Sequence, residues 1–315
     1  MTAFDYVTLD VFTATRFGGN PLAVVPDARG LRDEDMQRIA TEFNYSESTF
    51  VLPPADPANT ARVRIFSPTA EMPFAGHPNV GTAFVLGRQG SVFGRPIEDH
   101  VRFEERAGLV EADLIRDGGI VAGATIKAPR GLEIGATIDV ETVAACASIR
   151  VEDIATERHV PVAASVGLEF KFAELTNLEA LRRARPNPTA FVEADGRYPT
   201  RDDLFSLFLY VRRAGEGPAS RGAKGEHLVF RARMFAPLDN VPEDPATGSA
   251  SAALAAYIAS LRPEADFEGA LVVEQGIEMG RPSRLELRVR KRAGVVQEVT
   301  VGGRCVPVMR GVLDV

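Results

Sequence analysis

Two segments of this chain repeat one another at a fixed separation, and the repeat limits the folds that its 315 residues can adopt. The first segment runs from Arg64 to Ala83 and the second from Arg233 to Ala250. Four positions recur in register, 169 residues apart (233 − 64): Arg64 with Arg233, Phe66 with Phe235, Pro68 with Pro237, and Pro73 with Pro242. In each copy a strand-like stretch leads through small and polar residues into a helix-like segment. Two such strand–loop–helix units indicate two homologous halves.

Strand patterns outnumber helix patterns in both halves, with roughly one central helix in each. We therefore expect an α+β protein of two pseudosymmetric β-rich domains, each a curled sheet around a central helix. The N-terminal half is expected at 1–128, joined by a C-terminal strand at about 303–315, and the C-terminal half at 129–302. If the halves face each other, the unpaired N–H groups of two helix N-termini point into one cleft. Such a cleft can hold a small anionic substrate without a cofactor.

Several elements can be predicted from local patterns. Met36, Ile39, Ala40 and Phe43 have helical spacing after a possible cap at Asp33, and Thr49–Leu52 begins the next strand. Further elements are a helix over 178–184, a Pro-rich break over 186–188, a strand over 204–211 and a helix that ends before Pro263. The Gly-, Arg- and Lys-rich stretch 212–226 is expected to be a mobile loop.

Composition excludes several classes of protein. The formal net charge is −7 and no basic run is present, which argues against nucleic acid as a partner. The N-terminus has no signal-peptide pattern, and the apolar stretch from Ala250 to Leu261 is too short to span a membrane. Cys146 and Cys305 form no CxxC motif, so neither a disulfide framework nor a zinc site is indicated. We expect a cytoplasmic protein that binds a small molecule, neither nucleic acid nor membrane.

Glu47 and His77 are the candidate site residues of the first half. Glu47 lies in a polar junction, Tyr45–Ser48, between a predicted helix and a predicted strand. It is either a solvated carboxylate or a general acid/base in a partly apolar cleft, with Phe50 and Phe74 as candidates for the wall. His77 precedes the first repeat helix and is either a buried core or capping histidine, or a group that binds substrate or titrates near neutral pH. Metal binding is disfavoured because no second ligand lies at a suitable spacing.

Asp244, Thr247 and Ser249 surround the start of the second repeat helix. One of them is expected to cap that helix, which leaves the others available to the cleft. Gly76 and Gly248 would let backbone N–H groups approach a ligand closely. No nucleotide-binding glycine motif is present, and neither cysteine lies near either repeat, so proton chemistry must use oxygen or imidazole groups.

Taken together, the motifs resemble the phenazine-biosynthesis isomerase (PhzF-like) family. The matching blocks are FGGNPLAVV, NYSESTFV, RIFSPTAEMPFAGHPNVGTA, RMFAPLDNVPEDPATGSA and EQGIEMGRPS, in order along nearly the whole chain. The resemblance implies a fold similar to diaminopimelate epimerase, a homodimer, and no metal or organic cofactor. It also implies that Glu47 moves the proton and that Gly76, His77, Asp244, Gly248 and Ser249 contact the substrate. The family's namesake isomerises trans-2,3-dihydro-3-hydroxyanthranilate.

The resemblance leaves alternatives open. An epimerase or racemase of an amino or hydroxy acid is one, although a two-base racemase with paired thiols does not fit the cysteine positions. A non-catalytic member that only binds a small molecule is another. Glu47 has no evident counterpart in the second half, which favours an isomerase with one proton-transferring carboxylate over a symmetric racemase.

Overall fold

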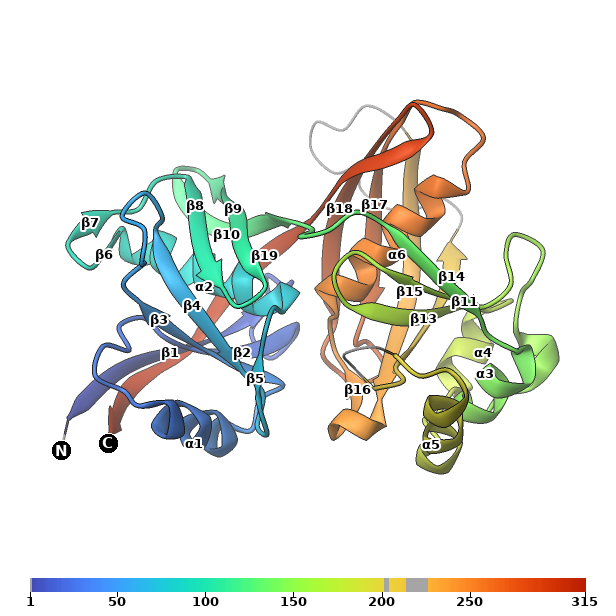
Figure 1. Ribbon diagram of the computed structural model, residues 1–315, viewed down its shortest axis with the longest axis horizontal. Helices are drawn as coiled ribbons and strands as arrows, with labels where there is room; N and C mark the ends of the chain where they lie inside the picture. The colour runs from blue at the N-terminus through green and yellow to red at the C-terminus, as the bar shows by residue number, and fades with distance from the viewer. Residues whose placement is uncertain (1, 201–203, 214–225) are drawn as a thin grey trace. The chain divides into compact units, whose positions relative to one another are not determined.

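The computed structural model describes residues 2–200, 204–213 and 226–315 (Figure 1). The chain divides into two compact units, the first Met1–Pro129 with Gly302–Val315 and the second Arg130–Val301. Strands outnumber the helices α1 to α6 in the described residues, so the predicted β-rich α+β class is confirmed. No helix in these ranges is long and apolar enough to cross a membrane.

Unit 1 contains ten complete strands, two helices and the end of an eleventh strand. Its strands are β1 Ala3–Val11, β2 Asn20–Val25, β3 Glu47–Leu52, β4 Ala61–Phe66, β5 Glu71–Met72, β6 Ser91–Val92, β7 Arg95–Pro96, β8 His100–Glu105, β9 Gly108–Asp117 and β10 Ile120–Lys127. Its helices are α1 Asp33–Phe43 and α2 Gly76–Gln89. The last strand, β19 Val295–Asp314, belongs to unit 1 from Gly302 onward.

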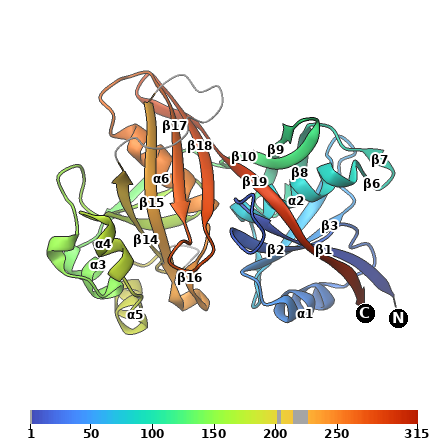
Figure 2. The same cartoon turned by 180° about the vertical axis from the view of Figure 1, so that it is seen from behind.

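The strands of unit 1 pair in a closed ring. The order is β19, β1, β2, β3, β4, β8, β9 and β10, and β10 pairs again with β19. Figure 2 shows β1 and β19 side by side with both chain ends nearby, as their register requires. Helix α2 contacts β1, β2, β3, β9 and β10, and its residues are buried without interruption from Gly76 to Leu86. Burial on every side, rather than along one stripe, is typical of a helix enclosed by its domain.

Unit 2 contains the remaining elements. Its strands are β11 Glu133–Thr137, β12 Val162–Ser165, β13 Glu169–Glu174, β14 Leu207–Arg213, β15 Glu226–Ala236, β16 Val241–Asp244, β17 Phe267–Gln275, β18 Ser283–Arg292 and the start of β19. Its α-helices are α3 Val140–Ala147, α4 Leu178–Arg183, α5 Pro188–Arg197 and α6 Gly248–Ser260, with single 3₁₀ turns at Val151–Asp153 and Pro237–Asp239.

Unit 2 repeats the strand order of unit 1. From β12 through β13, β14, β15 and β17 to β18, the pairings alternate between antiparallel and parallel. From β1 through β2, β3, β4 and β8 to β9, the same alternation occurs. Helix α6 occupies the place of α2 in chain order, contacts β12, β13, β17 and β18, and is buried from Ala250 to Ala259. The repeat in the sequence therefore corresponds to one topology used twice.

The repeated arginines hold the loops that lead into these two helices. Arg64 Nε lies 2.8 Å from Glu71 Oε1, and Arg233 Nη2 lies 2.7 Å from Glu243 Oε2. Each guanidinium also lies over the phenylalanine two residues later, at 5.1 Å for Phe66 and 4.8 Å for Phe235. Paired charge and ring contact at both positions explain why Arg-x-Phe recurs.

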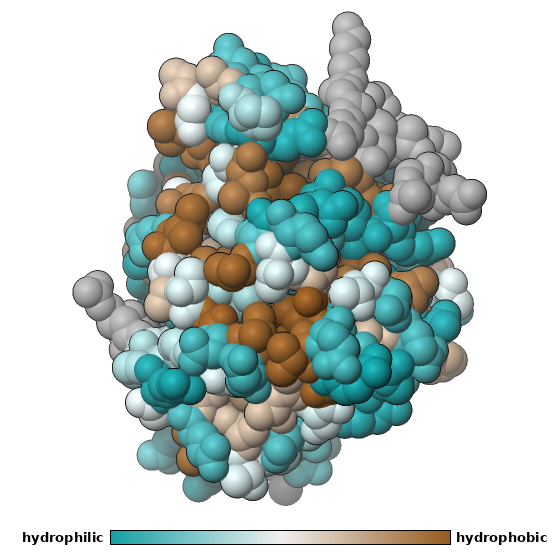
Figure 3. All heavy atoms as spheres, turned by 90° about the vertical axis from the view of Figure 1, so that its right-hand side faces the viewer, coloured by the Kyte–Doolittle hydropathy of each residue, from teal (hydrophilic) through white to brown (hydrophobic). Residues whose placement is uncertain are grey.

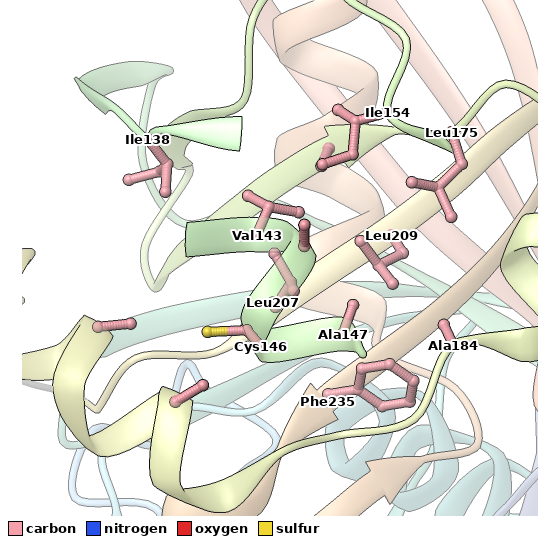
Figure 4. Packing of buried hydrophobic residues seen from close by; sticks show 14 of the residues in the cluster. Ile138, Val143, Cys146, Ala147, Ile154, Leu175, Ala184, Leu207, Leu209 and Phe235 are labelled. Carbon is pink, nitrogen blue, oxygen red and sulfur yellow. The ribbon is translucent and has the colours of Figure 1, made fainter. Parts of the chain in front are cut away.

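Helices α3, α4 and α5 form a second layer in unit 2, which the prediction of one central helix in each half did not include. They bury Val143, Cys146 and Phe191 in a cluster with Leu207, Leu209 and Phe235 of β14 and β15. Figure 4 shows Val143 and Cys146 of α3 beside the side chains of these two strands. The surface view of the side where α3 and α4 lie in Figure 1 shows hydrophobic residues exposed among hydrophilic ones (Figure 3). The predicted break at 186–188 is the start of α5, because Pro188 occupies its first turn, where its missing N–H is harmless.

The other predicted elements agree with the structure to different degrees. Met36, Ile39 and Ala40 of α1 are buried against Phe50 and Phe66, as their spacing predicts. Of the expected loop at 212–226, Arg212 and Arg213 end β14 and Glu226 begins β15, whereas 214–225 lies outside the described residues.

Candidate functional site

In unit 1 the candidate residues Glu47, Gly76 and His77 come together where β3 begins and α2 begins. Strand β3 starts at Glu47, which is in register with Leu22 of the parallel strand β2. Helix α2 starts at Gly76, with Ala75 as its N-cap residue and no side-chain cap. Glu47 therefore belongs to a strand and not to the predicted helix–strand junction. Its place is fixed by pairing with a distant strand.

Glu47 and His77 face each other at close range. Glu47 Oε2 lies 3.6 Å from His77 Nε2, and the two side chains are 18 % and 5 % exposed. On the other side of the ring, Nδ1 lies 3.3 Å from Asn20 Nδ2, and the Ser46 hydroxyl donates to Asn20 Oδ1 at 3.1 Å. The imidazole is thus held on one edge by the first strands of the unit, and its other edge points to the carboxyl group.

Burial keeps this imidazole neutral. It lowers the pKa of His77 to about 3, and a hydrogen bond to the Pro21 backbone only partly opposes the shift. The suggestion that His77 titrates near neutral pH is therefore wrong for this state. A neutral histidine can still donate or accept a hydrogen bond.

The prediction that Phe50 forms part of a wall beside Glu47 is wrong. Side chains alternate along β3, so Glu47 and Thr49 share one face and Phe50 lies on the other. Thr49 Oγ1 is 2.9 Å from Thr82 Oγ1 of α2, whereas Phe50 packs against Phe66 on the α1 side. Phe50 cannot line the surroundings of Glu47, because it lies on the opposite face of the sheet.

In unit 2 the candidates Asp244, Gly248 and Ser249 flank the start of α6. Asp244 ends β16 and is buried, and the Thr247 hydroxyl donates to its Oδ2 at 2.6 Å. Gly248 is the first residue of α6, and Ser249 follows it, half-buried. Thr247 occupies the N-cap position but its side chain makes no cap hydrogen bond. One of the three predicted residues, Thr247, is therefore the N-cap residue, but its hydroxyl donates to Asp244 and does not cap the helix.

Gln275 holds the segment between β16 and α6 through hydrogen bonds, and the sequence alone assigns it no role. Its side chain is fully buried, accepts from the Thr247 N–H at 3.1 Å and donates to the Asp244 carbonyl at 2.8 Å. Gly276 follows with φ +73°, and a Cβ there would come within 2.5 Å of the Pro245 carbonyl oxygen. The only signal in the sequence is the Gln-Gly pair at the end of a strand, which does not reveal its contact 28 residues away.

The two half-sites are not chemically equivalent. Ser48 pairs with Phe66 of the first repeat, and Leu207 pairs with Phe235 of the second. The residue that precedes Leu207, Ser206, therefore occupies the position equivalent to Glu47. Unit 2 thus has a serine where unit 1 has Glu47, and a serine hydroxyl cannot replace a carboxylate as a base at neutral pH. This difference agrees with the expectation that Glu47 has no counterpart in the second half.

The cysteines do not belong to either half-site. Cys305 lies in β19 opposite Val11, and Cys146 lies on α3 in the hydrophobic cluster between α3–α5 and the strands β14 and β15. Both cysteines are free and buried. Burial raises the pKa of the Cys146 thiol to about 12 and raises that of Cys305 as well. Within the described ranges, no three His, Cys, Asp or Glu side chains are grouped as a metal would require.

Comparison with known proteins identifies the family. The family model described as phenazine biosynthesis-like protein matches residues 9–311. An uncharacterized isomerase of Mesorhizobium japonicum is 38 % identical, with 99 % of each chain covered. The trans-2,3-dihydro-3-hydroxyanthranilate isomerase of Pseudomonas aeruginosa is 35 % identical, with 95 % of each chain covered. Among solved structures, a PhzF-family phenazine biosynthesis protein of Bacillus anthracis superposes with a TM-score of 0.84 at 25 % identity, covering all of both chains.

The family match spans nearly the whole chain and includes both repeat segments. Together with the full-length relatives, it confirms the resemblance seen in the motifs. The chain belongs to the PhzC-PhzF family and is an isomerase of that family.

Proposed function

We propose that this isomerase moves a proton within a small carboxylate-bearing substrate, with Glu47 as the acid/base and without a cofactor. The observation that carries the proposal is the contact of 3.6 Å between Glu47 Oε2 and the neutral imidazole of His77. A general acid/base must lie close to hydrogen-bonding groups that orient the reacting atoms.

The proposed reaction uses one carboxyl group twice. Ionised Glu47 removes a proton from one carbon of the substrate, and the electron pair left behind spreads toward the substrate's unsaturated, carboxylate-bearing end. Protonated Glu47 then returns the proton to a different carbon, so the double bond shifts and no atom is gained or lost. His77, neutral at every pH at which the enzyme would work, can hydrogen bond to the substrate without competing for this proton.

We propose that Asp244, Gly248 and Ser249 contact the substrate, and that Gly76 does so too, as the family resemblance implies. Asp244 is oriented by the Thr247 hydroxyl and its backbone carbonyl is held by Gln275, so it is a preorganised group. The first N–H groups of α2 and α6, which begin at Gly76 and Gly248, suit a substrate carboxylate. The proposal also includes a diaminopimelate-epimerase-like fold made of the two similar halves, and a homodimer. Sedimentation velocity would detect the homodimer.

The first substrate to test is the one acted on by the Pseudomonas aeruginosa relative, trans-2,3-dihydro-3-hydroxyanthranilate. Conversion would be followed by proton NMR with wild-type enzyme, Glu47→Gln and the control Glu42→Gln. Glu42 lies on the exposed surface of α1, so Glu42→Gln makes the same chemical change there as Glu47→Gln makes at the candidate site. We expect wild type and the control to convert the substrate, or a related unsaturated carboxylate, and Glu47→Gln to be inactive. Equal conversion by Glu47→Gln would contradict the proposed role.

A further inference from the structure

A second carboxyl group, Glu105 at the end of β8, is buried close to the start of α2. Both of its oxygens are inaccessible to solvent, and neither makes a hydrogen bond of good geometry within the described residues. Removing a carboxylate from water without such bonds is costly, and proteins usually avoid it by keeping the group protonated. The placement of Glu105 therefore requires an explanation that the proposed reaction does not supply.

The polar neighbour of Glu105 is Asn79, which lies in the first turn of α2, two residues after His77. Asn79 is fully buried, and its Nδ2 donates to the Ala75 carbonyl at 3.0 Å. Its Oδ1 is also buried without a hydrogen-bond partner within the described residues. After β8, the Ala107 N–H donates to the Pro73 carbonyl at 3.1 Å. The end of β8 is thus connected to both the loop before α2 and its first turn.

Among the residues that the structure describes, no cation forms an ion pair with Glu105. Of its chain neighbours, Glu104 accepts hydrogen bonds from Ala55, Asp56 and Asn59. Arg106 Nη1 lies 3.6 Å from Glu71 Oε2 on β5. Gly108, opposite Glu105 on β9, has no side chain, and His77 on α2 is neutral. Burial raises the pKa of Glu105 to about 8, and the Asn79 side chain only partly opposes the rise. At neutral pH the group is therefore a protonated acid, which can donate a hydrogen bond as well as accept one.

We propose that Glu105 is a positioning residue of the isomerase, whose buried carboxyl group supports the first turn of α2, and with it His77, through Asn79. Ionisation would place an uncompensated negative charge in this buried site, so the first turn of α2 would lose its support. The inference rests on the proposed function for its effect on activity, but its effect on the α2 turn is independent of any substrate.

The pH profile of kcat/KM for wild type, Glu105→Gln and Glu104→Gln tests the activity. Gln is neutral at all pH values and keeps a donor. We expect wild-type activity to fall above neutrality, by roughly tenfold at pH 9 for a group titrating near pH 8. Glu104→Gln should keep this basic limb, whereas Glu105→Gln should lose it and retain activity at pH 7. An unchanged basic limb in Glu105→Gln would overturn the inference.

Hydrogen exchange of the peptide covering 73–82, corrected for the intrinsic pH dependence, provides the readout that needs no turnover. Protection should fall between pH 7 and 9 in wild type and stay constant in Glu105→Gln. If every substrate fails while this pattern holds, the proposed function is wrong and the role of Glu105 stands. Constant protection in the wild type refutes the role, and it does so even if Glu105→Gln does not fold.

Discussion

Two helical glycines differ in their surroundings enough to predict opposite effects of the same substitution. Gly81 lies in the middle of α2, and a Cβ there would come within 2.4 Å of Leu22 Cδ2 and 2.9 Å of Val11 Cγ2. Gly196 lies in the last turn of α5, and a Cβ there would have nothing within 4 Å. Neither glycine has a positive φ. Alanine therefore fits the backbone at both positions, and only packing distinguishes them.

The magnitudes follow from two opposing contributions. Alanine in place of glycine at a compatible position stabilises a protein by about 0.4–1 kcal/mol. Inserting a methyl group into a packed core costs about 1–3 kcal/mol. We expect Gly196→Ala to be stabilising by about 0.5 kcal/mol and Gly81→Ala to be destabilising by about 1–2 kcal/mol. In Gly81→Ala, the midpoint temperature for thermal unfolding of unit 1 should then fall by roughly 2–8 °C, at about 2–4 °C per kcal/mol for a domain of this size.

Differential scanning calorimetry of each full-length variant measures both effects, and it can separate transitions if the two units unfold independently. The isomerase activity of Gly81→Ala, measured below the temperature at which this variant unfolds, then reports whether a shift of α2 also moves His77 in its first turn. If Gly81→Ala were as stable as wild type or more stable, α2 would not be packed tightly against β1 and β2, and the enclosed position of this helix would be refuted.

Three further predictions concern buried groups. Arg233→Met should destabilise by about 3–5 kcal/mol in urea unfolding, because it leaves Glu243 and the Ala184 carbonyl without their buried partner; a loss below about 1 kcal/mol would contradict this. Between about pH 4.5 and 8 the folded state keeps the Glu105 proton that the unfolded state releases, so the unfolding free energy should fall by roughly 1.4 kcal/mol per pH unit, and Glu105→Gln should remove that slope. Cys146 and Cys305 should resist a thiol reagent in the native protein and react in denaturant; rapid native labelling would show that they are accessible.

The features that sequence reasoning predicted correctly are local ones. The α1 core positions follow from helical spacing within 11 residues, and the Arg-x-Phe repeats carry their own stacking contact. The family assignment, too, depended on short motifs read in order. Such signals need no knowledge of which strand pairs with which.

The features that were missed depend on distant contacts. Glu47 looks like part of a polar junction until β3 is paired with β2, and Gln275 acquires its role only when the end of β17 meets the turn before α6. The face of β3 that carries Phe50 follows from its register, because successive side chains of a strand point to opposite faces. Phe50 is three residues from Glu47 and therefore lies on the other face. Pro186 and Pro188 conceal the start of helix α5 in the sequence, although Pro188 suits the first turn of a helix.

The central claim, that Glu47 moves the proton, is tested most directly by the rate of isomerisation in D₂O. Wild type, Glu47→Gln and Glu42→Gln would be compared by mass spectrometry of the product, with substrate binding measured separately by thermal shift. Loss of a general acid/base costs about 10²–10⁴ in rate. We expect a loss of this size for Glu47→Gln with binding retained, and wild-type rates for Glu42→Gln. Turnover by Glu47→Gln within a few-fold of wild type would show that Glu47 does not move the proton.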